Sequence, residues 1–209
     1  NVYWDYFMMI FSDRFVWVPF YASFIFVLLK NFPVKVVMST IVVITLIILF
    51  SDQTASGILK PLVARMRPSN PDNPISPMVH VVQGYRGGRY GFPSSHAANA
   101  WSMAFFAQYL VRRSKLTIFL CLWALITSYS RMYLGVHYFG DILIGTLIGF
   151  LYATLYYYIF QYFLRKHTER FKPNHDIRFA SVPIITGLVS IWVIICTSGI
   201  LSFYSIPLR

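Results

Sequence analysis

The sequence predicts an all-α fold, namely a polytopic membrane helix bundle of about six transmembrane helices preceded by an interfacial N-terminal helix. Two observations support this prediction. Of the 209 residues, 57% are hydrophobic and only 12% are charged, and soluble domains rarely carry so little charge. The apolar residues are also gathered into runs long enough to cross a hydrocarbon core of about 30 Å. We expect residues 1–209 to form one domain.

The predicted elements follow from where the apolar runs begin and end. Residues 3–11 are aromatic and Met-rich, which is typical of a helix lying at headgroup depth. The spanning helices are expected at 14–30, 36–59, 95–112, 116–134, 140–164 and 181–203. Residues 65–93 contain no apolar run but five prolines and four glycines. A connecting segment of this length is usually functional.

The net charge of +11 indicates membrane topology and an anionic ligand rather than nucleic acid. The basic residues lie in loops between apolar runs, with no Lys/Arg-rich tail and no base-stacking surface, so we expect no nucleic-acid partner. Six spans would put the polar motifs described below at one membrane face. Basic residues gather at the opposite face, which the positive-inside tendency makes cytoplasmic. They are Lys30, Lys35, Arg112, Arg113, Lys115 and members of the stretch 165–178.

Three short polar islands interrupt the apolar sequence. They read Lys60-x6-Arg67-Pro68, then Pro93-Ser94-Ser95-His96, then Ser130-Arg131-x5-His137-x3-Asp141. Charged and titratable groups are costly beside a bilayer, so their concentration here predicts a functional site. The cations, hydroxyls, imidazoles and carboxylate together suit the binding and transfer of a phosphate group.

The cations are predicted to bind phosphate. A phosphate ester carries up to two negative charges, which must be neutralised before a nucleophile can approach. Lys60, Arg67 and Arg131 can do this, and each guanidinium group can bind two oxygens. Ser94 can add its hydroxyl, and Ser95 a backbone N–H at the start of a helix.

The imidazoles and the carboxylate are predicted to carry out the chemistry. His137 and Asp141 are four residues apart and would share one face of a helix, so the carboxylate can hold the imidazole in one tautomer. His137 is the expected nucleophile, and His96 the expected proton donor and acceptor. This scheme needs no metal and no cofactor. Structural alternatives remain for single residues, since Lys60 alone could snorkel to the interface and Ser94 could serve as a helix N-cap.

In order and spacing, the islands resemble the three signature motifs of the type 2 phosphatidic acid phosphatase (PAP2) superfamily. That family includes membrane lipid phosphatases, glucose-6-phosphatase and the vanadium haloperoxidases. Its second motif usually reads Pro-Ser-Gly-His, and Ser95 stands here in place of the glycine. The resemblance implies a PAP2-like membrane phosphatase with a phosphohistidine intermediate, in which 65–93 is the active-site loop.

Within this family, undecaprenyl pyrophosphate is our first expectation for the substrate. Lipid A, phosphatidylglycerophosphate and phosphatidate are alternatives, as is a lipid phosphotransferase that uses the same site. A vanadate-dependent haloperoxidase and a non-catalytic transporter fit less well. The expected partners are the lipid phosphate and the surrounding membrane lipids. We expect a bacterial inner-membrane protein with its site facing the periplasm, and the oligomeric state stays open.

Five further residues have a specific expectation. Asp52 lies about 12 Å along the helix from Lys60, too far for a direct pair, and is expected to bond a neighbouring helix, with indirect support of the site as the weaker alternative. Arg86 and Arg89, in the segment 84–91, belong either to a lid or headgroup-binding element or to an exposed turn. Cys121 and Cys196 lie in apolar runs and are expected to be free thiols.

Overall fold

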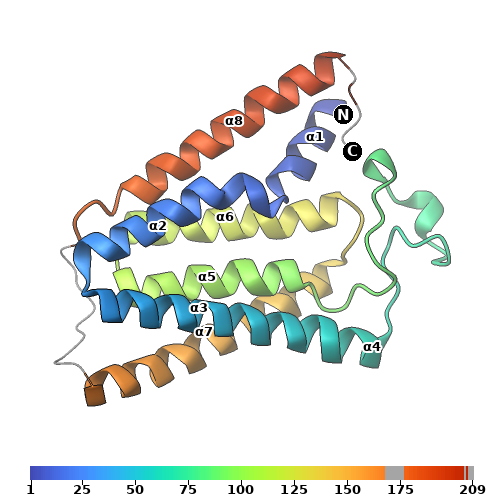
Figure 1. Ribbon diagram of the computed structural model, residues 1–209. Helices are drawn as coiled ribbons and strands as arrows, with labels where there is room; N and C mark the ends of the chain where they lie inside the picture. The colour runs from blue at the N-terminus through green and yellow to red at the C-terminus, as the bar shows by residue number, and fades with distance from the viewer. Residues whose placement is uncertain (168–176, 205, 207–209) are drawn as a thin grey trace.

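The computed structural model describes residues 1–167, 177–204 and 206. Among these residues the regular elements are all helices, apart from an isolated bridge between Met66 and Tyr90, so the all-α prediction is confirmed. The elements are α1 (Val2–Phe11), η1 (Arg14–Trp17), α2 (Val18–Asn31), α3 (Val34–Asp52), η2 (Gln53–Leu59), α4 (Lys60–Val63), η3 (Ser76–Met78), η4 (Val82–Gly84), α5 (Ser95–Val111), α6 (Ser114–Tyr133), α7 (Phe139–His167) and α8 (Val182–Tyr204) (Figure 1).

Four helical segments in the described part of the chain are long and apolar enough to cross a membrane. They are the continuous helix 34–63 (α3, η2 and α4), α6, α7 and α8. A fifth is counted if α1 and the η1–α2 helix, which meet at a bend of 62°, form one span. The chain is therefore an integral membrane protein, and the predicted number of six spans is approximate.

Two predicted spans are not among the four segments, namely the η1–α2 helix, which counts only together with α1, and helix α5. Helix α5 has 17 residues and lies in the middle of the bundle, where it packs against α3, α6 and α7 (Figure 1). Ten of its residues are buried, so neighbouring helices rather than lipid cover most of it. A helix in this position needs small residues for close packing more than it needs a long apolar surface.

Two glycines bring α5 and α7 into close contact. A Cβ atom on Gly145 would lie 2.4 Å from the Ser94 carbonyl oxygen, and one on Gly149 would lie 2.5 Å from that of Ala98. Glycines four residues apart let two helix backbones approach directly, as in other membrane helix pairs. The contact sets the start of α5 beside the first turns of α7, which brings the second and third islands together.

The N-terminal helix α1 is docked against the protein. It packs on α8 and α6, and the Tyr6 hydroxyl donates a hydrogen bond of 2.7 Å to the Ile206 carbonyl. The Trp17 indole N–H donates to the Phe11 carbonyl at 2.9 Å across the bend. The sequence predicted a helix here, whereas its position at the membrane interface stays a prediction.

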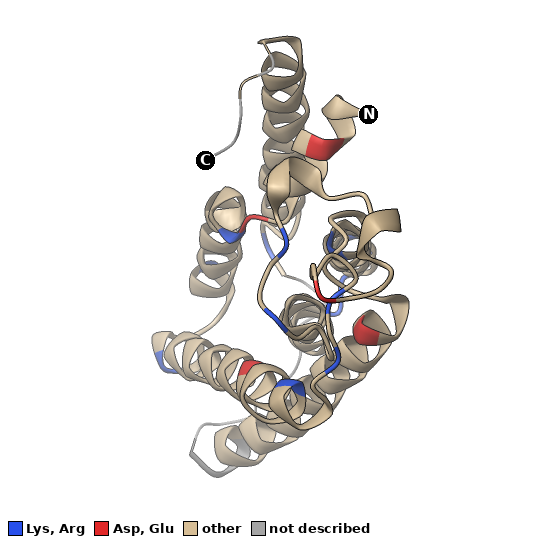
Figure 2. Cartoon of the chain, turned by 90° about the vertical axis from the view of Figure 1, so that its right-hand side faces the viewer, with Lys and Arg blue, Asp and Glu red and all other residues tan. Residues whose placement is uncertain are grey.

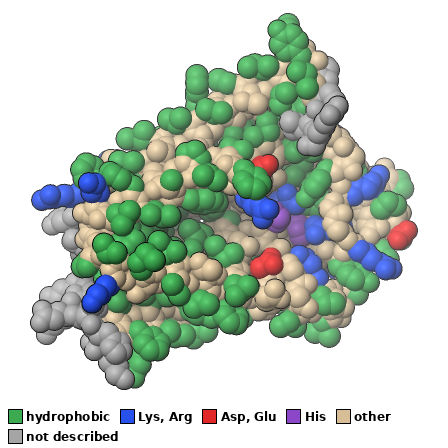
Figure 3. All heavy atoms as spheres, viewed as in Figure 1, with side chains coloured by type: hydrophobic (Ala, Val, Ile, Leu, Met, Phe, Trp, Pro, Cys, Tyr) green, Lys and Arg blue, Asp and Glu red, His purple; other side chains and the backbone are tan. Residues whose placement is uncertain are grey.

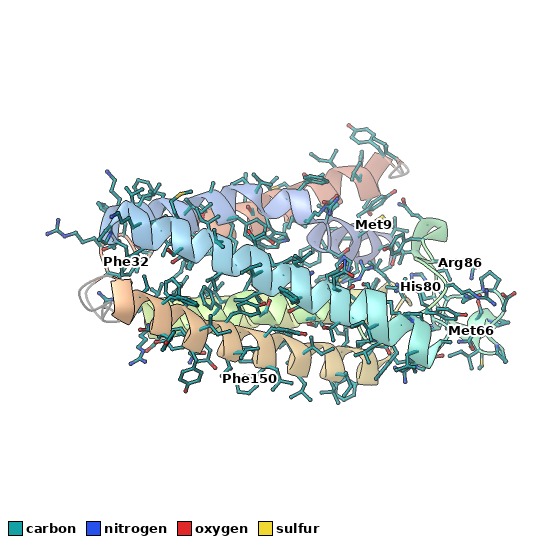
Figure 4. All side chains as sticks on the ribbon, turned by 60° about the horizontal axis from the view of Figure 1, so that its bottom comes forward. Met9, Phe32, Met66, His80, Arg86 and Phe150 are labelled. Carbon is teal, nitrogen blue, oxygen red and sulfur yellow. The ribbon has the colours of Figure 1, made fainter. Side chains whose placement is uncertain are left out.

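The bundle has two different ends. The long connection from α4 to α5 and the turn from α6 to α7 lie at one end, while the connections α2–α3 and α5–α6 lie at the other (Figure 1). Figure 4 places Met66, His80 and Arg86 at the first end and Phe32 at the second. Hydrophobic side chains cover much of the sides, and Lys and Arg gather toward the ends (Figure 3). Residues 168–176, which include Arg170 and Lys172 of the predicted basic stretch, lie outside the described residues.

Candidate active site

The start of α5 is built from the second island and is anchored to α7. Ser94 is the N-cap, and its hydroxyl accepts a hydrogen bond of 3.3 Å from the Ala97 N–H. The Ser94 N–H donates to the backbone carbonyl of Asp141 at 3.0 Å. Ser94 and Ser95 are buried. The positive end of the α5 dipole is therefore held next to the third island, where it can attract an anion.

The third island forms the turn between α6 and α7. Gly135 has a φ of +69°, and a Cβ there would lie 2.6 Å from the side chain of Val79, so the turn requires glycine. His137 Nδ1 lies 3.3 Å from Asp141 Oδ2, which also accepts a hydrogen bond of 2.8 Å from the Tyr138 N–H. The predicted pairing is observed, with His137 just before α7 and Asp141 in its first turn.

Arg67 contacts the other nitrogen of this imidazole. Its Nη1 atom donates to the Val136 carbonyl at 2.9 Å and lies 3.1 Å from His137 Nε2. If Nδ1 carries the proton toward Asp141, Nε2 offers its lone pair on the Arg67 side. The loop glycines pack against the same arginine, since a Cβ on Gly87 or Gly91 would lie 3.2 or 3.3 Å from its side chain.

Burial decides the charge of His137. Only 4% of the residue is exposed. Burial lowers the pKa of the imidazole from 6.5 to about 4, the hydrogen bond to Asp141 opposes this change, and the charge of Arg67 adds to it. At neutral pH the ring is therefore uncharged, which is the form that can act as a nucleophile.

Lys60 is connected to both α5 and its own helix. Its Nζ atom donates to Ser95 Oγ at 3.2 Å and to Ser56 Oγ at 2.9 Å, and the Ser56 hydroxyl lies 3.3 Å from Asp52 Oδ1. Asp52 was predicted to bond a neighbouring helix, and this is wrong. Ser56 lies four residues from both charges and bridges them within the π-helical segment η2, an irregularity often found at functional sites.

Arg131 is held by segments that are distant in the sequence. Its guanidinium group donates to the Ser12 hydroxyl at 3.1 Å and to the Tyr85 hydroxyl at 2.8 Å. The Nε atoms of Arg67 and Arg131 are buried and have no hydrogen-bond partner within the described part of the chain. Buried unpaired donors are costly, and donors gathered in this way suit an anion with several oxygens.

His96 completes the group on the first turn of α5. Its side chain is exposed and lies within electrostatic range of His137 and of all three predicted phosphate-binding cations. All eight predicted site residues thus lie at one end of the bundle, which Figure 2 views directly and where Figure 3 shows His among Lys and Arg. They are Lys60, Arg67, Ser94, Ser95, His96, Arg131, His137 and Asp141.

Three residues that help to hold the site together were not predicted from the sequence. Arg65 is ion-paired with Asp141, while Ser12 and Tyr85 hold Arg131. Arg65 could have been found, because alternate residues of an extended segment share one side and it stands two positions before Arg67. Nothing in the local sequence links Ser12 or Tyr85 to a residue in α6.

The segment 84–91 is part of the wall of the site. Arg86 donates to the Ser69 carbonyl and, at 3.1 Å, to the Ser76 hydroxyl, so it stabilises the loop itself. The Arg89 guanidinium lies 5.4 Å from the Tyr90 ring centre. Whether either residue also binds a headgroup stays a prediction.

Two other expectations concern thiols and metals. Cys121 and Cys196 are free, as predicted. The described residues contain no group of three or more His, Cys, Asp or Glu side chains that could hold a metal ion.

Comparison with known proteins identifies the family. The PAP2 superfamily model matches residues 36–165, a range that contains all three islands. A lipid A 4'-phosphatase of Bacteroides thetaiotaomicron is 44% identical over 196 residues, which is 90% of this chain and 85% of that protein. A lipid A 4'-phosphatase of Porphyromonas gingivalis is 35% identical over 159 residues, 76% of this chain and 66% of that protein.

A more distant relative is a dihydrosphingosine 1-phosphate phosphatase of Schizosaccharomyces pombe, 27% identical over 171 residues, 72% of this chain and 39% of that protein. No solved structure matches this chain. The family match and the two bacterial relatives confirm the resemblance carried by the three islands, and the chain belongs to the PAP2 superfamily.

Proposed function

We propose that this membrane protein is a lipid phosphatase that removes phosphate from lipid A through a phosphohistidine intermediate on His137. The proposal rests on the surroundings of His137 taken together with the similarity to a known phosphatase. His137 lies between a buried carboxylate and a buried arginine, in a chain that is 44% identical over 90% of its length to a lipid A 4'-phosphatase. The first part supports phosphoryl transfer, and the second supports the substrate.

Phosphate binding falls to the three cations in this proposal. Lys60, Arg67 and Arg131 neutralise the phosphate oxygens and the charge that develops during transfer. The unpaired Nε atoms of both arginines support this role. The N–H groups at the start of α5 add further donors. A cationic cluster of this kind does not depend on a metal ion.

The first chemical step forms a bond from His137 Nε2 to phosphorus and breaks the bond from phosphorus to the ester oxygen. Protonated His96 gives its proton to the departing oxygen, so that lipid A leaves with a free hydroxyl. Asp141 stabilises the positive charge on the phosphorylated imidazole through Nδ1–H. Burial and the neighbouring cations lower the pKa of His96 to about 3, and a bound phosphate opposes this shift because it brings negative charge into the site.

The second step returns the enzyme to its initial state. Neutral His96 takes a proton from water, and the resulting hydroxide attacks phosphorus while the phosphorus–nitrogen bond breaks. Inorganic phosphate leaves, and His137 is again uncharged. Exchange of proton donor and acceptor roles between two half-reactions is general for a single acid–base residue.

Purified protein in detergent tests the substrate. We would measure phosphate release from lipid A, undecaprenyl pyrophosphate, phosphatidylglycerophosphate and phosphatidate, with mass spectrometry to locate the phosphate lost from lipid A. We expect lipid A to react fastest at the 4' position, and H137A to be inactive while eluting like the wild type. Faster phosphate release from undecaprenyl pyrophosphate would contradict the proposed substrate. Activity in H137A would contradict the proposed phosphohistidine intermediate.

We further propose that the site faces the periplasm. It lies at the end opposite the connections α2–α3 and α5–α6. Lys30 and Lys35 flank the first connection and Arg112 lies in the second, and basic residues at such connections favour the cytoplasm. A single cysteine introduced at Asn70, in a variant without Cys121 and Cys196, would be labelled by an impermeant thiol reagent in intact spheroplasts. Labelling only after lysis would contradict this orientation.

A further inference from the structure

Arg65 is held in one orientation beside the site. It follows Ala64, whose left-handed backbone (φ +50°) ends α4, and its guanidinium group is ion-paired with Asp141 Oδ1. The guanidinium carbon lies 4.6 Å from the Phe92 ring centre and 5.1 Å from that of Tyr138. Aromatic rings and a carboxylate together orient a planar cation much better than a carboxylate alone.

Asp141 divides its two oxygens between different partners. Oδ1 contacts Arg65, whereas Oδ2 faces His137 Nδ1 at 3.3 Å and accepts from the Tyr138 N–H at 2.8 Å. The terminal torsion of an aspartate is soft, so a carboxylate held by one oxygen can rotate. Arg65 removes that freedom by holding the second oxygen. With Arg65 in place, Asp141 is fully buried.

We propose that Arg65 is a positioning residue for His137, which keeps Asp141 Oδ2 directed at Nδ1 and thereby keeps Nε2 directed at the phosphate. The inference rests on the proposed function, in which Nε2 attacks phosphorus. In the first island, which reads Lys60-x6-Arg67, Arg65 occupies one of the positions marked x, at which the pattern allows any residue. It acts on the nucleophile through the carboxylate, in contrast to Arg67 and Arg131, which would bind the phosphate.

Arg65 also changes the electrostatics at the imidazole. Its positive charge offsets part of the negative charge of Asp141, so that protonation of His137 is less favourable. Loss of Arg65 would therefore act on the pKa of His137 in two opposing ways, because the uncompensated charge of Asp141 raises it and a weakened hydrogen bond to Asp141 lowers it. The charged and titratable groups around His137 come from several elements. They are Asp141 of α7, Arg65 and Arg67 of the loop, Arg131 of α6 and His96 of α5.

The test compares R65Q and R65K with the wild type, and uses R14Q as the matched control. Arg14 also lies over an aromatic ring, 5.1 Å from the centre of Phe15, but it is exposed and outside the site. We expect R65Q to lower kcat on lipid A by about 10²-fold with little change in KM. NMR should show a weaker hydrogen bond from the Nδ1 proton of His137 in R65Q, as an upfield shift and faster exchange of that proton with solvent. R65K should recover part of kcat, and R14Q should match the wild type.

The outcomes separate this inference from the proposed function. Wild-type kcat in folded R65Q, a change confined to KM, or an unchanged Nδ1 proton signal of His137 would each overturn the positioning role. If R65Q does not fold, a kcat several-fold below wild type in R65K supports the role, and wild-type kcat in R65K overturns it. If the wild type itself releases no phosphate from any lipid, the proposed function fails, while the Nδ1 proton signal of His137 in R65Q still decides whether Arg65 positions the imidazole.

Discussion

Lys30 and Lys35 are exposed on either side of the two-residue connection between α2 and α3. At the other end of the bundle, Arg67 and Arg131 are only 8% and 4% exposed. The first pair meets water or lipid headgroups, which tolerate many arrangements. The second pair is bonded to atoms from other segments of the chain. The same kind of charge is thus exposed at one end, where we propose that it sets the membrane orientation, and buried in a fixed geometry at the other.

Of the changes that keep His137 and leave the fold intact, replacing Asp141 by Asn should have the largest effect. The amide has the same shape, but it can place the wrong hydrogen-bonding group at His137 Nδ1 and it removes the charge that stabilises the phosphorylated ring. We expect kcat to fall by about 10³-fold, measured as phosphate release from lipid A. A kcat near the wild-type value would show that the buried end does not depend on this charge.

Replacing Gly145 by Ala tests whether helix contact positions the site. The new methyl group would lie 2.4 Å from the Ser94 carbonyl, so α5 must move away from α7, and we expect a loss of about 1–3 kcal/mol in stability together with reduced activity. Gly199→Ala is the matched control, because no atom lies within 4 Å of its Cβ position. It should leave the melting temperature unchanged or raised. Equal melting temperatures for both variants would contradict the packing argument.

The pH response of His137 sharpens the contrast between buried and exposed groups. With a pKa of about 4, the His137 ring is uncharged in about 90% of the molecules at pH 5. An imidazole of pKa 6.5 would be uncharged in roughly 3% of them. NMR titration of His137 should therefore show a midpoint near 4. Because the unfolded chain takes up the proton first, this residue lowers stability as pH falls from about 6.5 toward 4. A midpoint near 6.5 would contradict its burial.

Replacing Ser56 by Ala should have a smaller effect. It removes the hydroxyl that bridges Asp52 and Lys60 but leaves the contact of Lys60 with Ser95. We expect up to a tenfold rise in KM for lipid A, since one neutral-to-charged hydrogen bond is worth about 1.5 kcal/mol. Ser39→Ala is a suitable control, because the Ser39 hydroxyl only donates to the Lys35 carbonyl in its own helix.

The smallest effect is expected at the opposite end and on metal removal. K30Q and K35Q should change kcat and KM by less than about twofold, because exposed charges contribute little, although they weaken the topology signal. Dialysis against EDTA should likewise leave activity unchanged if the cations alone bind the phosphate. Loss of activity that Mg²⁺ or Zn²⁺ restores would contradict metal independence.

The sequence predicted the structure best where a feature depends on residues that are close together in the chain. Apolar runs marked α6, α7 and α8, and the spacing of His137 and Asp141 indicated their contact. Prediction was less successful where the fold joins distant segments. Arg65 and Asp141 are 76 residues apart, and no periodicity connects a loop to the first turn of a helix. The π-helical turn that lets Ser56 bridge two charges has no composition signal either, which is why the partner of Asp52 was predicted wrongly.

The glycine contact between α5 and α7 also limits how a lipid can reach the site. Backbone meets backbone at Gly145 and Gly149 with no space for one additional methyl group. An acyl chain cannot pass between these two helices at that depth. The hydrocarbon tails of a substrate must therefore approach from another side of the bundle, and the α5–α7 seam acts as a closed wall behind the reacting phosphate.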